Sequence, residues 1–302
     1  MVNWSGQVLR SLLFVPGSDE HKLGKVGGFG ADAIVIDLED AVADDQKLAA
    51  RDTTRVAVPT YGDDTVVIVR VNGIGTGSME GDVAAVVVAG LDAIMVPKVE
   101  DAATLTRLDA AIAAAEDAAG IPTGTIRVIA LIETSLGVSR CEAILAGAPE
   151  RVHTAAFGAG DFTTELGIDL TPEATEILYA RSRLVIATRA AGLAAPIDGP
   201  WLRLRDTEGL EVDSRRSRGL GFQGRVTVYP PQVETVLRAY STLTDEEVTR
   251  ERRIIEAFEE AERHGVASLR VDGIFVDYPI YRMAHDRMLR YDAWREAAAA
   301  SA

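Results

Sequence analysis

The sequence has few of the residues on which disulfide, zinc and nucleic-acid sites depend. Its 302 residues include one cysteine, Cys141, and four histidines, so an internal disulfide is excluded and no zinc-ligand spacing is present. Lys and Arg number 31 against 46 Asp and Glu, which gives a formal net charge of −15. This deficit of positive charge argues against a nucleic-acid groove and against binding to an anionic membrane surface.

Long hydrophobic runs are also missing. No stretch of about 18 apolar residues could span a bilayer, and the apolar run in "VLRSLLFVPGS" is too short for a signal peptide. We therefore expect a soluble, cytoplasmic protein. With 47% hydrophobic and 25% charged residues, the chain has the composition of an ordinary globular protein with ample material for a core.

Short apolar runs rich in β-branched residues are present instead, and alanine-rich segments of helical composition separate them. Because the runs are continuous rather than alternating, they predict strands covered on both faces, as in a parallel sheet. We predict eight strands, at residues 10–17, 33–40, 65–72, 93–99, 127–134, 152–161, 197–204 and 225–230. Eight strand–helix units predict an α/β TIM (β/α)8 barrel. An open, doubly wound sheet is the alternative, but no G-x-G-x-x-G follows the first strand.

The pattern changes after the eighth strand. Residues 244–265 predict a charged helix, and residues 271–294 predict a short strand followed by another helix. We therefore divide the chain into a barrel domain at 9–240 and a C-terminal helical lid extension at 241–302. A helix that closes the bottom of the barrel is the alternative interpretation of this tail, since terminal helices often dock for stability.

Polar side chains recur where the predicted strands end. The carboxyl ends of the strands form the active-site rim of a TIM barrel. Strands two to seven carry polar groups there, namely Asp37, Glu39, Asp40, Arg70, Asn72, Lys98, Glu133, Asp161 and Asp198. A single acid at a strand end usually only faces solvent. Six consecutive strands that end this way indicate a site.

Glu133 and Asp161 end strands five and six, whose backbones lie about 4.8 Å apart in a sheet. Two carboxylates that converge either raise one pKa or recruit a cation. Two protein oxygens, with the other positions left to water and substrate, fit Mg²⁺ better than a closed Ca²⁺ or Zn²⁺ cage. We therefore predict a substrate-chelated Mg²⁺. The glycine-rich turn at 157–161 would let backbone N–H groups approach a ligand carboxylate.

Arg70 ends strand three, next to the acidic segment at 37–40. A guanidinium can bind a carboxylate through two N–H groups or stabilise a developing oxyanion. A structural salt bridge to Glu39 or Asp40 is the alternative, and the two roles are compatible.

Several motifs resemble, in order, those of one enzyme family: "RSLLFVPG", "ADAIVIDLEDAV", "VRVNG", "IMVPKVE", "ALIET", "FGAGDFTTELG" and "GFQGRVTVYPPQV". Over roughly residues 9–290 the chain is similar to the citrate lyase β-subunit-like group of the HpcH/HpaI aldolase superfamily. The resemblance implies a Mg²⁺-dependent lyase that cleaves or forms a 3-hydroxyacyl-CoA such as malyl-CoA, citramalyl-CoA or citryl-CoA. The products would be an acyl-CoA and a 2-keto acid, that is glyoxylate, pyruvate or oxaloacetate.

The resemblance also assigns catalytic roles. Glu133 and Asp161 would bind Mg²⁺, Arg70 would act on the substrate, and Glu39 would support Arg70. Asp277 lies in a segment similar to the family's lid. It would serve as acid or base in the site of an adjacent subunit, which implies a homo-oligomer with a trimer as the expected form.

Contacts to the substrate and to CoA follow from the same resemblance. Arg10 and Lys25 would contact the CoA phosphates, and Phe14 and Gly160 would line the site beside Arg70. These positive charges would explain how an acidic protein binds a polyanion.

Two positions depart from the family pattern. Tyr229 stands where many relatives have His, and Gly160 stands where citrate lyase subunits often carry Glu. Gly160 resembles the malyl-CoA lyase side of the family, which counts against assignment to a citrate lyase complex. The alternatives to an acyl-CoA lyase are a free-acid, pyruvate-type metal aldolase, which would lack the CoA-binding positive charges and the lid, and a carrier-dependent citrate lyase β subunit.

Overall fold

Eight short strands close into a parallel barrel. The computed structural model describes residue 4 and residues 8–62, 65–241 and 243–300. Each strand pairs in parallel with its sequence neighbours, and β8 pairs with β1 to close the ring. The strands are β1 (Ser11–Pro16), β2 (Ala33–Asp37), β3 (Val66–Arg70), β4 (Ala93–Val96), β5 (Arg127–Ile132), β6 (Val152–Phe157), β7 (Ile197–Asp198) and β8 (Gly224–Thr227). The predicted TIM barrel is confirmed, and the open sheet is ruled out.

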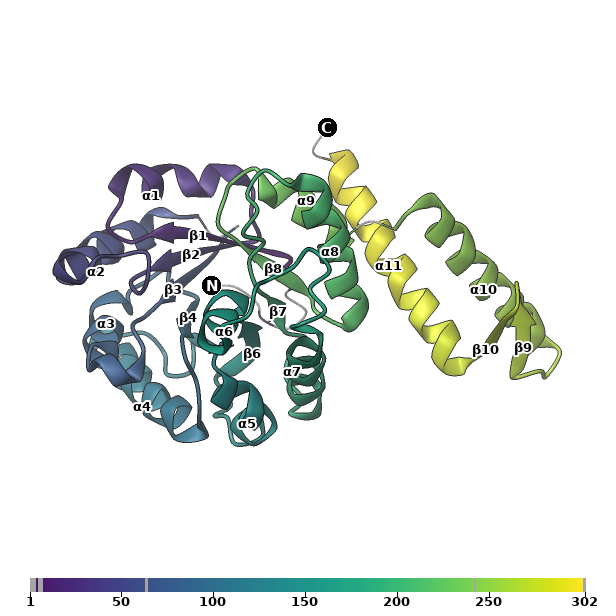
Figure 1. Ribbon diagram of the computed structural model, residues 1–302. Coiled ribbons are helices and arrows are strands. Elements are labelled where there is room, and N and C mark those ends of the chain that lie inside the picture. Colours follow the sequence, from purple (N-terminus) through teal and green to yellow (C-terminus); the bar gives the residue numbers. More distant parts are fainter. Residues whose placement is uncertain (1–3, 5–7, 63–64, 242, 301–302) are drawn as a thin grey trace. The chain divides into compact units, whose positions relative to one another are not determined.

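Helices follow the strands around the outside of the barrel (Figure 1). They are α1 (Glu20–Val26), α2 (Lys47–Ala57), α3 (Met79–Val86), α4 (Ala102–Ala119), α5 (Ser135–Ala146), α6 (Ala159–Leu166), α7 (Leu178–Ala190), α8 (Thr207–Leu220) and α9 (Gln232–Ser241). Short 3-10 turns lie at Gly27–Phe29, Asp44–Gln46, Val58–Thr60 and Ile74–Thr76.

All eight predicted strands are present, but β7 is only two residues long. A Gly–Pro pair at 199–200 follows it directly. Pro200 has no N–H to donate to a neighbouring strand. The apolar residues after it therefore form a loop on the carboxyl side of the barrel rather than a continued strand.

Side-chain alternation along the strands separates two cores. One cluster consists almost entirely of strand residues and fills the barrel interior, for example Ala33 and Val35 on β2, Val66 and Ile68 on β3, and Ile129 and Leu131 on β5. The intervening residues, such as Ile34 and Val67, pack with helix residues in a second cluster. Every second residue of β2, β3 and β5 points into the barrel. The next inward position at the carboxyl end of these strands is Asp37, Arg70 and Glu133, respectively. The interior thus passes from apolar to charged at its carboxyl end.

The chain divides into two compact units, Met1–Tyr240 and Ser241–Ala302. The second unit consists of α10 (Asp245–Arg263), the antiparallel hairpin of β9 (Ser268–Val271) and β10 (Ile274–Asp277), and α11 (Tyr278–Ala300). Asp272 and Gly273, both with positive φ, form the hairpin turn. A small core of Ile254, Phe258, Val276 and Ala284 holds the unit together.

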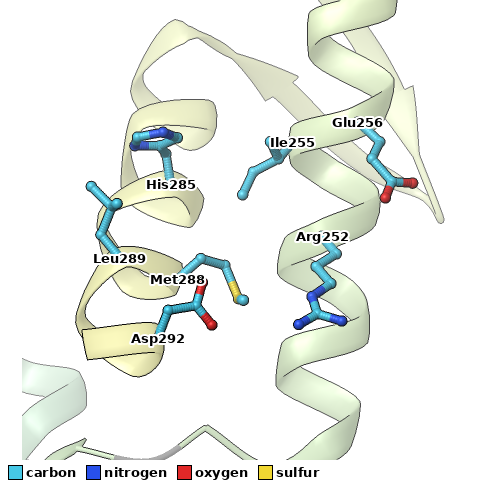
Figure 2. A pocket seen from close by; sticks show the side chains of 7 residues that line it. All are labelled: Arg252, Ile255, Glu256, His285, Met288, Leu289 and Asp292. Carbon is cyan, nitrogen blue, oxygen red and sulfur yellow. The ribbon is translucent and has the colours of Figure 1, made fainter. Parts of the chain in front are cut away.

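A pocket lies between α10 and α11 (Figure 2). The side chains that line it are Arg252, Ile255, Glu256, His285, Met288, Leu289 and Asp292. Asp277 is not among them; it is the last residue of β10, eight residues before His285.

Among the described helices of both units, none has the length and hydropathy that a membrane span requires.

Candidate active site

Asp37 is the residue that fixes Arg70. The two residues are partners in the register of β2 and β3. Arg70 Nε and Nη2 each donate to one Asp37 carboxylate oxygen at 2.7 Å. Asp37 is itself anchored, because its oxygens accept the backbone N–H groups of Glu39 and Ala41, both at 2.9 Å. Asp37 thus uses two of the five guanidinium N–H groups and leaves donors on Nη1 and Nη2 for other oxygens.

Glu39 lies between two cations, beside Arg70 as expected. Its Oε2 is 3.1 Å from Arg70 Nη1, and its Oε1 accepts a hydrogen bond from Lys98 Nζ at 2.7 Å. Burial raises the pKa of Glu39, while the charges of Arg70 and Lys98 act in the opposite direction. Asp40 is further away, at 3.9 Å from Arg70 Nη1 and more exposed. The predicted salt bridges therefore exist, but they are secondary to the Asp37 pair.

Lys98 has a larger part in the site than the sequence indicated. It follows β4 with φ of 52°, a left-handed backbone that is uncommon for a residue with a side chain. Its backbone N–H donates to Glu133 Oε1 at 3.0 Å. Its Nζ is 2.7 Å from Glu39 and 3.4 Å from Asp161. The sequence placed Lys98 on the rim but assigned it no role.

Glu133 is the buried carboxylate of the site. It is 3% exposed, and among the described residues no Lys, Arg or His lies within ion-pair distance of it. Burial, together with the charges of Glu39 and Asp161, raises the pKa of Glu133 to about 8. Gly158 packs directly against it, because a Cβ at position 158 would lie 2.3 Å from Glu133 Oε2. Only glycine fits at position 158.

Asp161 lies in the first turn of α6, where the partial positive charge of the helix end favours a carboxylate. Its side chain is 38% exposed, far more than that of Glu133. Gly160 precedes it, and no atom lies within 4 Å of the position that a Cβ would take there. The fold does not require glycine at 160, so its missing side chain leaves open space next to Asp161.

Glu133 and Asp161 fit a divalent cation. They come from the ends of neighbouring strands, and the charge of Asp161 acts on Glu133. Within the described residues, no three His, Cys, Asp or Glu side chains form a metal cage. Two carboxylates, one of them buried without a cation partner, leave the remaining positions of an oxygen-preferring ion to water and substrate. These two residues would hold Mg²⁺; their ligand role stays a prediction.

Asn72 faces away from this group and has a structural role. Its backbone N–H and its Nδ2 both donate to Asp82, at 2.8 and 2.7 Å. Asp82 also accepts from Arg51 Nε at 2.6 Å. These contacts tie the end of β3 to α2 and α3.

Asp198 also lies away from the rim, contrary to expectation. Ile197 belongs to the barrel interior, so Asp198 points outward between the strands and the helices. It accepts from Arg181 Nε of α7 at 3.1 Å and from Arg225 Nη2 of β8 at 2.7 Å. Asp213 of α8 pairs with the same two arginines, and all four residues are at most 3% exposed. Arg216, which is more exposed, lies 3.5 Å from Asp213. We call the four buried residues the closed network; it was not anticipated from the sequence.

Arg10 lies at the opposite end of the barrel from Glu133, because it precedes β1 and the rim follows the strands. Its backbone N, Nε and Nη2 donate to Asp32 at 2.7, 2.9 and 2.7 Å. Arg10 is thus paired with Asp32 at the amino end of the barrel, and its contact with the CoA phosphates stays a prediction. Lys25 is exposed on α1, and Phe14 lies inside the barrel, with Arg70 Cζ 5.0 Å from its ring centre.

Asp277 and Tyr229 each contact a residue close by in their own segment. Asp277 belongs to the second unit, where its Oδ1 accepts the Ile280 N–H at 3.3 Å and caps α11. Tyr229 follows β8 and is half-buried, and its backbone carbonyl accepts the Gln232 N–H at 2.9 Å. A role for Asp277 as acid or base stays a prediction.

Comparison with known proteins decides the family. The model of the HpcH/HpaI aldolase/citrate lyase family matches residues 10–230, which cover the barrel from β1 to the end of β8. The chain belongs to this family. The match includes the ends of all the strands that carry Asp37, Arg70, Glu133 and Asp161.

Similar members of the HpcH/HpaI family cover almost the whole chain. The citrate lyase subunit beta of Leuconostoc mesenteroides is 38% identical over 273 residues, which is 90% of this chain and 89% of that protein. A (3S)-malyl-CoA thioesterase of Cereibacter sphaeroides is 37% identical over 270 residues, 89% of each chain. The crystal structure of CitE from Mycobacterium tuberculosis in complex with magnesium, acetoacetate and coenzyme A has a TM-score of 0.78 at 28% identity. That comparison covers 94% of this chain and 98% of the other.

Proposed function

We propose that this protein is a Mg²⁺-dependent carbon–carbon lyase that cleaves or forms a 3-hydroxyacyl-CoA. One observation carries the proposal: a buried carboxylate without a cation partner, Glu133, shares a rim with Asp161 and with a rigidly held arginine, Arg70. The two carboxylates suit a metal ion, and Arg70 suits a developing oxyanion. The magnesium, acetoacetate and coenzyme A in the CitE structure support the same assignment.

The proposed cleavage separates charge between two parts of the substrate. When bound, Mg²⁺ supplies a Lewis acid for the oxygens of the part that becomes the 2-keto acid. Arg70 directs its Nη1 and Nη2 donors to the thioester oxygen, where negative charge develops as the carbon–carbon bond breaks. The electron pair of that bond becomes the acyl-CoA enolate, and the hydroxyl proton leaves to solvent.

The enolate then needs a proton at carbon, and Asp277 is the candidate donor. The unit that carries Asp277 presents apolar surface around it, since Phe275 is 64% and Ile274 40% exposed. Large exposed apolar patches often mark contact surfaces. They support the proposal that the lid docks on a second subunit in a homo-oligomer.

A substrate panel tests the activity. The purified chain alone, with Mg²⁺, is offered malyl-CoA, citramalyl-CoA and citryl-CoA, and the release of keto acid and of free CoA thiol is followed separately. Release of keto acid from any of the three supports the proposal, and simultaneous release of thiol shows that thioester hydrolysis follows. The reverse reaction is measured with acetyl-CoA and glyoxylate, pyruvate or oxaloacetate.

The same panel separates the two alternatives. Cleavage of free hydroxy acids, with no turnover of any acyl-CoA, would identify a pyruvate-type aldolase. The similarity to a citrate lyase subunit beta favours the second alternative, a subunit that acts only on a carrier-bound substrate. Complete inactivity of the folded, metal-loaded chain on all free acyl-CoA substrates would support that alternative.

Mixing two inactive variants tests the role of Asp277. Asp277→Ala and deletion of residues 268–302 should each leave a folded barrel that binds metal and has little activity. Exchange of subunits between Asp277→Ala and Glu133→Ala chains should restore part of the activity, because some mixed sites would combine an intact metal centre with an intact lid. If the exchanged mixture stays inactive although both variants assemble, Asp277 acts within its own chain or is not the acid.

A further inference from the structure

We propose that Lys98 is a positioning residue whose ammonium pairs with Asp161 until the divalent cation binds, and thereby lowers the affinity of the site for the metal. The inference rests on the assignment of Glu133 and Asp161 as metal ligands. It concerns a residue to which neither the family resemblance nor the expected mechanism gives a role.

Two separate contacts connect Lys98 to the two carboxylates. Its backbone N–H holds Glu133 Oε1 at 3.0 Å. Its ammonium lies 3.4 Å from Asp161 Oδ2 and 2.7 Å from Glu39 Oε1. Lys98 is therefore the one described cation within ion-pair distance of Asp161, and it spans the gap to Glu39.

The two contacts have different consequences for metal binding. The backbone contact orients Glu133 without placing charge on it, so it is compatible with a bound ion. The ammonium competes with the ion, because it occupies an Asp161 oxygen and carries positive charge close to where the ion would lie. The side chain is 42% exposed, so it can swing into solvent when the ion arrives.

The backbone at Lys98 makes the two contacts separable by mutation. Its φ of 52° is a conformation that glycine adopts without strain and that asparagine tolerates well. Lys98→Gly and Lys98→Asn should therefore keep the backbone N–H on Glu133 and remove only the ammonium. Lys98→Arg keeps the positive charge. Arg70 still compensates Glu39 in all three variants.

Metal affinity is the readout, measured without substrate. Mn²⁺ binding is followed by electron paramagnetic resonance, and Mg²⁺ is then titrated as the competitor. Loss of one partly exposed ion pair and of one nearby charge predicts Mg²⁺ affinity about three- to tenfold tighter in Lys98→Gly and Lys98→Asn. Lys98→Arg should bind within about twofold of wild type, because it retains the competing charge.

Control variants distinguish this effect from others. Lys22→Met removes one positive charge from an exposed pair with Asp19 on α1, and it should leave the affinity unchanged. A merely structural role for Lys98 predicts weaker or unchanged binding in Lys98→Gly and Lys98→Asn, and that result overturns the proposal. Binding that survives Glu133→Gln overturns both this proposal and the metal assignment. Tighter binding without lyase activity leaves this inference standing and counts only against the proposed function.

Discussion

Two clusters of charged residues surround the barrel strands, and they differ in charge balance. The network behind β7 and β8 has two arginines and two aspartates, Arg181, Arg225, Asp198 and Asp213. The rim cluster has five carboxylates and two cations, namely Asp37, Glu39, Asp40, Glu133 and Asp161 with Arg70 and Lys98. The four buried residues of the first are formally neutral, and the more exposed Arg216 lies 3.5 Å from Asp213 at its edge. The second carries a formal excess of three negative charges.

The comparison shows how structural and functional ion clusters can be distinguished. Buried charges are tolerated when each has a partner, and the network behind β7 and β8 satisfies this condition. The rim cluster leaves Glu133 without a cation partner among the described residues. Such an imbalance destabilises the protein unless a further cation binds, and perturbed carboxylates of this kind are concentrated at functional sites.

Glu133→Gln should break the rim cluster with the largest effect. We expect Mg²⁺-dependent turnover to fall by about 10³-fold or more, because the Lewis acid contributes several kcal/mol. The metal-free variant should melt no lower than wild type, since burial already raises the pKa of Glu133 and favours its neutral form, which the amide of glutamine resembles. Activity assays with and without EDTA, together with thermal melting, check both points. Full activity of wild type in EDTA would contradict the metal assignment.

Arg70→Lys should have the next largest effect. The variant keeps the charge but loses the planar fork that Asp37 holds. We expect kcat to fall by about 10²- to 10³-fold, the scale for loss of one preorganised donor. Steady-state kinetics measures the loss, and circular dichroism controls for folding. Activity within about threefold of wild type would make Arg70 a structural ion-pair partner only.

Asp213→Asn should break the closed network, with an effect on stability rather than on the site. It leaves Arg181 and Arg225 with one shared carboxylate, and the free energy of unfolding should fall by about 3–5 kcal/mol. Urea denaturation measures the change, and Glu234→Gln on the exposed face of α9 is the matched control. Metal affinity of the folded variant should equal that of wild type. A change below about 1 kcal/mol would show that the network contributes little.

Acid should weaken the closed network by a smaller amount. Although burial opposes it, contact with Arg181 and Arg225 lowers the pKa of Asp213 from 3.8 to about 2. A carboxyl with a depressed folded-state pKa stabilises the protein above its unfolded-state value, and this contribution is lost as the pH falls from about 4 to 2. The difference corresponds to about 2 kcal/mol. Denaturation of wild type and Asp213→Asn across this range should show a steeper loss in wild type.

Much of the site could be predicted from the sequence because strand composition and strand direction are both encoded locally. Continuous β-branched runs specified eight strands, and the carboxyl-end rule brought Arg70, Glu133 and Asp161 to one rim. Parity goes further once the interior residues are known. Counting in twos from the interior residues Val35 and Ile197 places Asp37 inside the barrel and Asp198 outside it. Because these strands are apolar on both faces, the sequence alone does not show which parity points inward.

The contacts of Lys98 had no signal in the sequence. β4 ends at Val96, and Lys98 belongs to neither a strand nor a helix. Neither the side-chain alternation of a strand nor the periodicity of a helix therefore predicts the direction of its side chain. The same limit applies to Arg10, which resembles a CoA-binding position but is paired with Asp32 at the amino end of the barrel.

The sequence by itself determined the barrel, its family and which strands carry charge at their ends, because hydrophobic periodicity and chain direction act over a few residues. Only the tertiary structure decided which charges face one another. A left-handed turn at Lys98 and the register between β2 and β3 set those pairings, and both depend on residues that are distant in the chain. The charge imbalance at the rim is therefore a property of the folded barrel, although every residue that produces it is visible in the sequence.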